Sequence, residues 1–349
     1  MTTFPSARAW LPVVFAVLLA ACAGTPDSRG SAADSWPVGT EAALLEANLV
    51  PAPAAYQIRY FEWVDRDRQR AVPAKLYLPP AAVLCGPVPL VVFSHGLGGS
   101  REGYSYLGTN WAARGYASLH VQHTGSDSRV WKGSPFDVVS RLRSAANEAE
   151  AVDRVRDLGF ALDRVLADPQ LAGIIDPGRI LVAGHSYGAN TALLAAGAAF
   201  ARPQGAMSFR DSRILGAVII SAPPFHGEAD PDAIVRPIAI PTLHITATGD
   251  DIRVPGYASG YDDRLQIFAA TGGRQKALVA FRDGSHSMFT DRLAAGGREL
   301  NQQVKATTVD LTLAFFAGVV GGASGALASR SAGYGDLLVR LEFEPPAVQ

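Results

Sequence analysis

The feature that most constrains this 349-residue chain is the stretch RILVAGHSYGANTALLAA at positions 179–196. Its apolar run at 180–183 is typical of a fully buried strand, and its Ala- and Leu-rich end favours a helix. Between them lies GHSYG, whose two glycines let two backbones approach closely while a tight turn exposes the serine hydroxyl. A bare GxSxG also arises by chance in a Gly-rich chain, but its place between β-like and α-like segments predicts Ser186 as a nucleophile.

The rest of the chain predicts strands that alternate with helices. Apolar or aromatic runs predict strands at 56–64, 71–78, 89–94, 117–122, 215–221, 241–248 and 277–281, and helical spacing predicts helices at 104–114, 148–166 and 301–317. The stretch 124–135 is expected as a polar loop, and 337–343 as an edge strand or a short helix. This alternation predicts an α/β fold in one domain at 54–349, a mainly parallel central sheet with helices on both faces.

The N-terminus predicts export. Arg8 precedes an apolar run at 10–19 that is too short to span a bilayer but fits a signal peptide at 1–21. Leu-Ala-Ala-Cys resembles the bacterial lipoprotein box, which makes Cys22 the lipidation site and anchors the chain at a membrane, on the periplasmic side of the outer membrane; an ordinary signal peptide is the alternative. Residues 22–53 are expected to form a flexible tether. A lipidated Cys22 leaves Cys85 without a disulfide partner.

A serine nucleophile requires a base, and elimination among the seven histidines selects it. Three of them, His95, His120 and His123, precede the serine in or beside early strands, and His185 belongs to the turn itself, while His244 lies within a strand. His286 follows the strand at 277–281 in a loop, where an imidazole can reach a neighbouring strand end, so it is the predicted base. His226, in another loop, remains the alternative.

The acid should leave the strand at 241–248, because the partners follow in the order serine, acid, histidine. Asp250 and Asp251 both stand there. In proteins with this turn the strand commonly runs into Gly-x-x-Asp-x-x-Val-Pro, and counting back from Pro255 selects Asp251. Thr248 stands where the glycine would fall, so Asp250 remains open.

The oxyanion that forms during acyl transfer requires two backbone N–H donors. One is expected from Tyr187, which follows the nucleophile, and the other from Leu97 in the loop HGLGGS at 95–100. A phosphate-binding loop would need a following helix and a lysine or G-x-G-x-x-G spacing, which this loop lacks. The aromatic side chains of Trp131 and Phe136 are expected to line the substrate pocket.

Four motifs together carry a family resemblance: SHGLGGSR at 94–101, Gly115-Tyr116, HTGSDS at 123–128 and GHSYG. They resemble the bacterial hydrolases grouped as predicted dienelactone hydrolases and the platelet-activating-factor acetylhydrolase branch of the α/β-hydrolases, over about 56–317. The resemblance implies an α/β-hydrolase fold and a serine esterase with its oxyanion hole at Leu97 and Tyr187. True dienelactone hydrolases use a cysteine nucleophile, so that name does not define the substrate. The elbow is also similar to those of polyester hydrolases and cutinases.

The predicted chemistry is therefore ester hydrolysis by Ser186, His286 and Asp251, with a lipid or other small-molecule ester as substrate. No metal or organic cofactor is called for. The net charge of −1 gives no electrostatic reason to expect nucleic acid as a partner. Lipid or phospholipid acyl hydrolysis and polyester hydrolysis are alternative substrate classes. A peptidase on the same fold, and an inactive envelope lipoprotein that keeps the fold, are the remaining alternatives.

Overall fold

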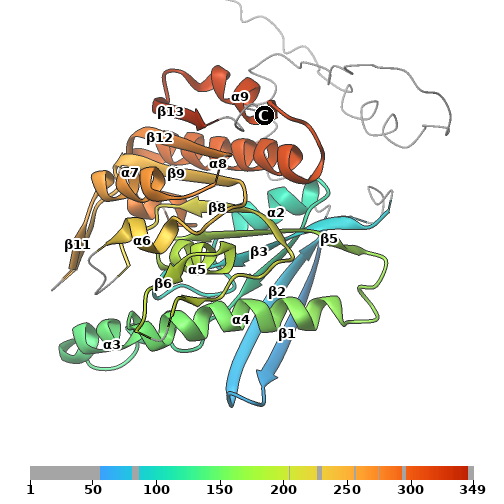
Figure 1. The fold of residues 1–349 in the computed structure, drawn as a ribbon, viewed down its shortest axis with the longest axis vertical. Coiled ribbons are helices and arrows are strands. Elements are labelled where there is room, and N and C mark those ends of the chain that lie inside the picture. The colour runs from blue at the N-terminus through green and yellow to red at the C-terminus, as the bar shows by residue number, and fades with distance from the viewer. Residues whose placement is uncertain are drawn as a thin grey trace, which may run out of the picture. The chain divides into compact units, whose positions relative to one another are not determined.

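A nine-stranded mixed sheet organises the part of the chain that the computed structural model describes, namely residues 56–80, 86–203, 205–225, 230–254, 257–273, 275–292 and 296–344 (Figure 1). In sheet order its strands are β1 Gln57–Asp65, β2 Arg70–Leu78, β4 Ala117–Val121, β3 Val88–Ser94, β5 Ile175–His185, β8 Ile214–Ile220, β9 Thr242–Gly249, β12 Lys276–Ser285 and β13 Leu338–Glu344. The strands from β4 to β12 are parallel to their neighbours, whereas β1, β2 and β13 pair antiparallel at the two edges. The predicted α/β fold with a mainly parallel sheet is confirmed.

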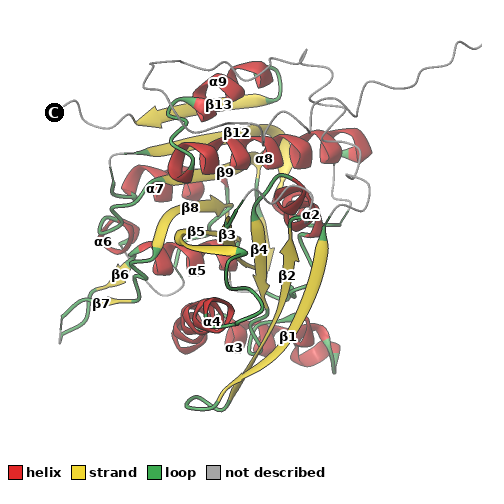
Figure 2. Cartoon of the chain, turned by 90° about the vertical axis from the view of Figure 1, so that its right-hand side faces the viewer, coloured by secondary structure: helices red, strands yellow, loops and turns green. Residues whose placement is uncertain are grey.

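Helices cover both faces of this sheet, as Figures 1 and 2 show. One face packs against α4 Glu148–Leu166, α5 Tyr187–Ala196, α6 Pro231–Val235 and α7 Tyr261–Ala270. The other face packs against α2 Ser105–Ala113 and α8 Gly297–Val320. Shorter elements complete the described chain: the helices α3 Val138–Ala145 and α9 Ala326–Ser331, the 3₁₀ turns η2 Ser128–Trp131, η3 Pro135–Asp137, η4 His286–Phe289 and η5 Ala332–Tyr334, and the paired strands β6 Ala199–Phe200 with β7 Met207–Ser208 and β10 Ile252–Val254 with β11 Tyr257–Ser259.

The continuous apolar runs of the central strands follow from burial on both faces. In β3, Leu90 and Val92 face the α4 and α5 side, while Val91 and Phe93 face α2 and α8. Successive side chains of a strand point to opposite faces, so a strand covered on both sides needs apolar residues at every position. This arrangement places the carboxyl ends of the parallel strands along one edge of the sheet, where loops can bring polar side chains together.

Helix α8 is the one described helix that is long and apolar enough to cross a membrane, with a mean hydropathy of 1.2. It packs instead against the sheet, where Leu311 and Phe316 are fully buried. Its apolar character is that of a core helix.

The structure extends the predicted elements and adds others. The bounds of α4 coincide with the predicted helix at 148–166, and β13 is the edge-strand alternative rather than the short helix. The stretch at 124–135 contains the turn η2, and α7 was not predicted. Helix α7 gives little apolar periodicity because its buried residues are Arg264, Ile267 and Phe268. The predicted signal peptide, the tether with Cys22, and also Cys85 and His226, lie outside the described residues.

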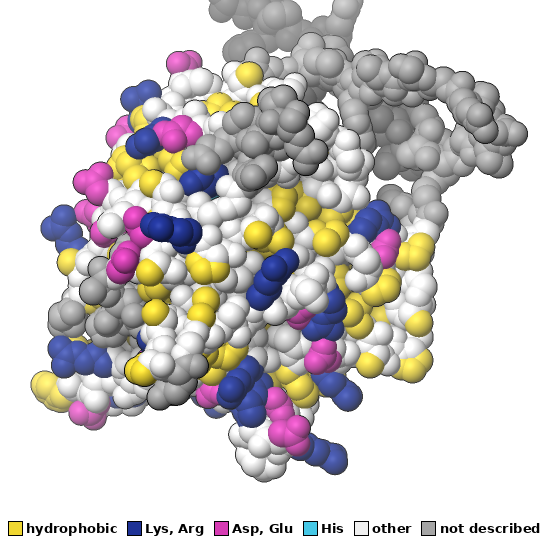
Figure 3. All heavy atoms as spheres, viewed as in Figure 1, with side chains coloured by type: hydrophobic (Ala, Val, Ile, Leu, Met, Phe, Trp, Pro, Cys, Tyr) yellow, Lys and Arg dark blue, Asp and Glu magenta, His cyan; other side chains and the backbone are white. Residues whose placement is uncertain are grey.

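Charged side chains of both signs are interspersed over the described residues on the face drawn in Figure 3. The tip of the β1–β2 hairpin extends beyond α4 in both ribbon views.

Candidate active site

Ser186 lies in the sharp turn between β5 and α5, with backbone angles of φ 56° and ψ −125°. Its N–H donates to the carbonyl of Ile220 at 2.9 Å, which ties the turn to the neighbouring strand β8. A Cβ at Gly184 would lie 2.0 Å from the carbonyl oxygen of Gly188, and one at Gly188 would lie 2.0 Å from that of Ser94. Both glycines are therefore required by close backbone approach, and the positive φ is the strain expected of a nucleophile turn.

His286 faces this serine from the end of β12. It is the first residue of η4, and its Nε2 lies 2.9 Å from Ser186 Oγ. The structure thus brings together the predicted nucleophile and the predicted base, although they are 100 positions apart in the chain.

Asp250, not Asp251, is the carboxylate that contacts this imidazole. Its Oδ1 lies 2.7 Å from His286 Nδ1, and its side chain is fully buried. Asp251 points outward, is about half exposed and pairs with Arg253 at 3.0 Å. The expectation that Asp251 would face the imidazole is therefore not met. The chain turns sharply here, because the N–H of Asp250 donates to the carbonyl of Ala247 at 3.0 Å and that of Asp251 to the carbonyl of Gly249 at 2.9 Å. This turn directs only one of the two adjacent carboxylates into the site.

The Asp250 carboxylate is held by several donors. Thr246 Oγ1 donates to Oδ2 at 2.7 Å, and Arg264 Nε lies 3.5 Å from the same oxygen. Burial by itself would raise the pKa of Asp250, but the hydrogen bond and charge of His286, with further help from Arg264 and Ser221, hold that pKa well below its usual range. The carboxylate is consequently ionised, as a group that orients an imidazole must be.

Ser221 was not predicted as part of the site. It directly follows β8 with a φ of 56°, and its Oγ lies 2.7 Å from Asp250 Oδ1 and 2.7 Å from His286 Nδ1. The Ser221 hydroxyl can donate its hydrogen to the carboxylate, and its oxygen can accept from the Nδ1–H of the imidazole, which also donates to the carboxylate. The only local signal is its position at the end of a predicted strand, because its partners come from β9 and β12.

Leu97 and Tyr187, the predicted oxyanion donors, line the same cavity as Ser186 and His286. Among the described residues, neither the N–H of Leu97 nor that of Tyr187 has a hydrogen-bond acceptor. Tyr187 opens α5, where the first N–H groups have no partner within the helix. Both amides are therefore available to an oxyanion.

Arg154 of α4, which is fully buried, ties together the elements that carry these two amides. It donates to the carbonyl of His95, to Ser94 Oγ at 3.0 Å and to Thr191 Oγ1 at 2.9 Å. Its guanidinium also lies 4.5 Å from the ring centroid of Tyr187. One side chain thus contacts both the loop that leads to Leu97 and the start of α5.

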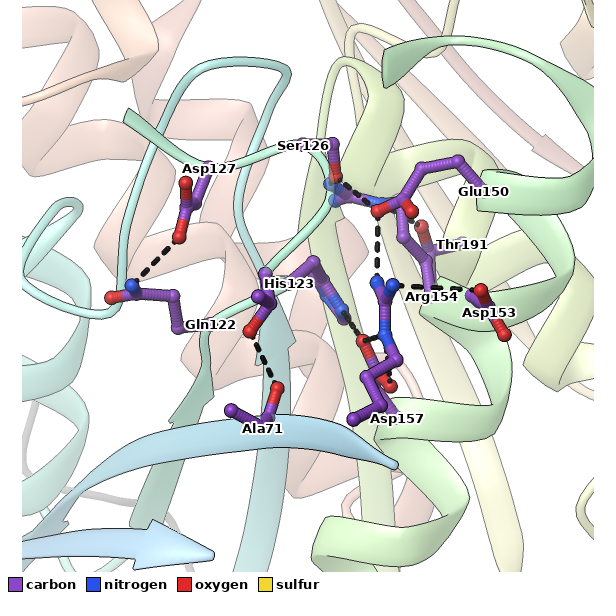
Figure 4. A network of polar contacts seen from close by, with 12 residues as sticks. Ala71, Gln122, His123, Ser126, Asp127, Glu150, Asp153, Arg154, Asp157 and Thr191 are labelled. Atoms are coloured by element: carbon purple, nitrogen blue, oxygen red, sulfur yellow. Dashed lines mark hydrogen bonds and ion pairs between the residues drawn. The ribbon is translucent and has the colours of Figure 1, made fainter. Parts of the chain in front are cut away.

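A buried polar network surrounds Arg154 (Figure 4). Asp157, also on α4, accepts from Arg68 and Arg70 of the hairpin and from Nδ1 of His123 at 3.1 Å. Glu150 accepts from Arg70 and from Ser126 Oγ. Figure 4 shows these side chains of α4 pointing towards the loop that follows β4. The network joins the hairpin, α4 and this loop beneath the site.

The cavity beside Ser186 has a volume of about 250 Å³. Its apolar wall includes Trp131, Val139, Leu142, Pro223, Pro224 and Ile252. Trp131 therefore lines the pocket as expected, held there by a 2.9 Å hydrogen bond from Nε1 to the carbonyl of Gly98. Phe136 does not line it and is 94% exposed. Among the described residues that line the cavity, Arg143 is the one Arg, Lys, Asp or Glu side chain.

Five other histidines are buried, and burial is the main cause that lowers the pKa of each: His95, His120, His123, His185 and His244. They are neutral packing or hydrogen-bonding groups near neutral pH. Within the described residues, no group of three His, Cys, Asp or Glu side chains is arranged to hold a metal ion.

Two comparisons with known proteins find similarity to platelet-activating factor acetylhydrolases. Residues 81–132 match the family described as "Platelet-activating factor acetylhydrolase, isoform II". The chain is also 27% identical over 140 residues to the platelet-activating factor acetylhydrolase of Cavia porcellus, which covers 30% of this chain and 31% of that relative. The resemblance to this branch of the α/β-hydrolases is confirmed, and the mainly parallel sheet with helices around it fits an α/β fold.

Proposed function

We propose that this chain hydrolyses carboxylic esters of lipids through a covalent acyl intermediate on Ser186. The observation that carries the proposal is the continuous line of hydrogen bonds from Ser186 Oγ to His286 Nε2 and from His286 Nδ1 to Asp250 Oδ1, beside an apolar cavity. The similarity to a platelet-activating factor acetylhydrolase supports the same class of reaction.

Acylation is the first half of the reaction. His286 Nε2 takes the hydroxyl proton as Ser186 Oγ forms a bond to the ester carbonyl carbon, and the carbonyl π electrons move to oxygen. The N–H groups of Leu97 and Tyr187 then donate to this oxyanion, each stabilising it by roughly 3 kcal/mol in comparable sites. When the oxyanion re-forms the carbonyl, the bond to the alcohol oxygen breaks and His286 gives that oxygen its proton.

Deacylation repeats these steps with water. His286 removes a proton from water, the resulting hydroxide adds to the acyl carbon, and the bond to Ser186 Oγ breaks as the serine recovers its proton. Asp250 remains ionised throughout and stabilises the imidazolium that forms twice in each cycle. The products are a carboxylic acid and an alcohol.

The cavity favours a lipid ester that carries an anionic group. Its wall is apolar around Trp131 and Leu142, which suits an acyl or alkyl chain. The exposed Arg143 adds a positive charge at the same wall, and guanidinium groups bind phosphate or carboxylate well. A phospholipid ester combines both features, whereas a neutral polyester would leave Arg143 unused.

Two other functions are weighed against this one. A peptidase on this fold usually carries a propeller or a helical cap, and the described residues between 56 and 344 form neither. An inactive lipoprotein would not need the strained backbone of Ser186 or a buried carboxylate aimed at His286.

The test compares the full-length chain with Ser186→Ala in detergent. Both are assayed on p-nitrophenyl esters from acetyl to palmitoyl, on a phospholipid with a short acyl chain and on a peptide panel, with intact-mass detection of fluorophosphonate labelling. We expect ester turnover and one label per chain in the wild type, and neither in the variant. Peptide cleavage without ester turnover would support the peptidase, and no labelling or turnover would support the inactive lipoprotein.

We also propose that Cys22 is lipidated and holds the enzyme at the periplasmic side of the outer membrane. The support is the sequence Leu-Ala-Ala-Cys after an apolar run. In a bacterial host, metabolic labelling with a fatty acid should mark the wild type but not Cys22→Ser, and the wild type should fractionate with the outer membrane. Processing to a soluble form without lipid would favour an ordinary signal peptide.

A further inference from the structure

Tyr104 and His185 form a buried link between the oxyanion loop and the catalytic base. The N–H of Gly96 donates to the Tyr104 hydroxyl at 3.1 Å, and that hydroxyl lies 2.9 Å from His185 Nδ1. On the other side of the ring, His185 Nε2 lies 3.1 Å from the carbonyl oxygen of His286. Four residues from three separate parts of the chain are thus joined in one line.

The direction of each hydrogen bond follows from the groups at the two ends. The carbonyl of His286 can only accept, so His185 carries its hydrogen on Nε2 and presents Nδ1 as an acceptor. The Tyr104 hydroxyl therefore donates to Nδ1, and one of its lone pairs accepts the N–H of Gly96. All polar atoms along the line are satisfied in this single arrangement.

Burial maintains the protonation states that this arrangement requires. Tyr104 is 4% exposed and His185 is 2% exposed. Burial raises the pKa of Tyr104 to about 12, which keeps its hydroxyl protonated. Burial, followed by the charge of His286, lowers the pKa of His185 well below its ordinary value, which keeps its ring neutral.

The backbone is shaped to bring these groups together. Tyr104 has a φ of 59°, in the left-handed region that few residues other than glycine adopt. A Cβ at Gly96 would lie 3.1 Å from the Tyr104 hydroxyl and 3.3 Å from Ser186 Cβ, so glycine allows the close approach. The rings of His185 and His286 also lie against each other, with centroids 4.7 Å apart. Such local strain persists where the surrounding structure needs that geometry.

We propose that Tyr104 and His185 are positioning residues that set the oxyanion loop and the base at a fixed distance from Ser186. Gly96 directly precedes Leu97, so the hydroxyl that holds the Gly96 amide also orients the next amide. The same line ends on the backbone of His286. This inference rests on the proposed ester hydrolysis, because it assigns the two residues to that reaction.

The first test uses Tyr104→Phe, which removes only the hydroxyl. We expect kcat on a p-nitrophenyl ester to fall by roughly 10- to 100-fold while KM changes by less than about twofold, because the loss appears in the transition state. The rate of fluorophosphonate labelling should fall in parallel. The matched control is Tyr334→Phe, which removes a tyrosine hydroxyl that donates to Asp310 outside the site. It should keep the wild-type kcat.

Two variants of His185 test its two hydrogen bonds separately, the one with the Tyr104 hydroxyl and the one with the His286 carbonyl. His185→Gln can keep a donor near the Nε2 position, towards His286, and His185→Asn can keep an acceptor near the Nδ1 position, towards Tyr104. Because Tyr104→Phe and His185→Gln break the same bond, the double variant should be no slower than the slower single variant. Rate losses that multiply in the double variant, or a Tyr104→Phe kcat within twofold of the wild type, would overturn the inference. These histidine variants also serve if Tyr104→Phe does not fold.

A measurement without substrate keeps this inference distinct from the proposed function. In protein labelled with ¹⁵N-histidine, His185 should appear as the neutral tautomer with hydrogen on Nε2, and Tyr104→Phe should perturb its Nδ1 resonance. If these signals appear but no ester is cleaved, the link stands and the proposed function falls. If esters are cleaved but His185 carries its hydrogen on Nδ1, the link falls and the function stands.

Discussion

Asp250 and His286 are joined by a 2.7 Å hydrogen bond although 36 positions separate them in the chain. The next residue, Asp251, has the same side chain and lies at the surface against Arg253. Two adjacent carboxylates thus differ in burial and in their partners, which makes them a matched pair for mutation.

Asp250→Asn should lower kcat by about 10⁴-fold, because an amide neither stabilises the imidazolium nor holds the required tautomer. Asp251→Asn should leave kcat within twofold, since that carboxylate is about half exposed and its ion pair among the described residues is with Arg253. Steady-state kinetics on one p-nitrophenyl ester compares the two variants. Equal losses in both would mean that Asp250 does not act through His286.

Acid should unfold this protein because five buried histidines resist protonation in the native state. Their pKa values are lowered, to about 3 for His120 and His244, while the unfolded chain binds these protons near pH 6.5. Their contribution to stability is therefore present above about pH 6.5 and is lost as the pH falls towards their folded pKa values. Within that window, each histidine lowers the free energy of unfolding by about 1.4 kcal/mol for every pH unit of acidification.

Urea denaturation at a series of pH values measures this slope. His244→Leu should reduce the slope of the unfolding free energy against pH by about 1.4 kcal/mol per pH unit, because it removes one buried histidine with a lowered pKa. His244 Nε2 has no hydrogen-bond partner among the described residues, so no bond of that atom is lost. Asp157 has the opposite effect on the free energy of unfolding. Burial raises its pKa to about 6, so the native state binds this proton at a higher pH than the unfolded chain does, and acidification stabilises the fold through this group. An unchanged slope in His244→Leu would contradict the prediction.

Arg154→Met should destabilise the fold by about 3 kcal/mol and lower kcat more than it changes KM. The change leaves the His95 carbonyl, which leads to the oxyanion loop, without its donor. Arg156→Met, on the same helix, is the control, because the Arg156 side chain is exposed and should change stability by less than about 0.5 kcal/mol. Urea denaturation and kinetics on the same preparations test both effects. A destabilised variant with full kcat would limit Arg154 to a structural role.

Gly188→Ala should abolish activity, because a Cβ at this position would lie 2.0 Å from the carbonyl oxygen of Ser94 and force α5 away from β3. Gly159→Ala, in the middle of α4, has no atom within 4 Å of the new Cβ and should stabilise the protein by about 0.5–1 kcal/mol. Thermal unfolding and ester turnover distinguish the two. An active Gly188→Ala variant would show that the turn tolerates a side chain.

Arg143→Gln should lower kcat/KM for an ester with a negative charge by about fivefold relative to a neutral ester of the same length. The difference should shrink at high salt, because the guanidinium is exposed. Lys132→Gln, an exposed change outside the cavity wall, should leave the ratio of the two rates unchanged. A constant ratio in Arg143→Gln would remove the support for an anionic substrate.

The sequence alone determined the features that depend on local pattern. The periodicity of α4 gave both of its ends, and the glycines around Ser186 predicted a tight turn between a strand and a helix. His286 could be selected because it follows a strand in the order that the sheet imposes. The helix ends and the turn depend on residues close together in the chain, whose spacing is visible in the sequence. The choice of His286 depends on the order of the elements along the chain.

Only the tertiary structure decided which groups complete the site. Asp250 rather than Asp251 faces His286 because of the direction of one residue after β9, which periodicity does not specify. Ser221 meets His286 across 65 positions and Tyr104 meets His185 across 81 positions. These residues come together because neighbouring strands of a parallel sheet are distant in sequence, so their contacts depend on the strand order rather than on any local pattern.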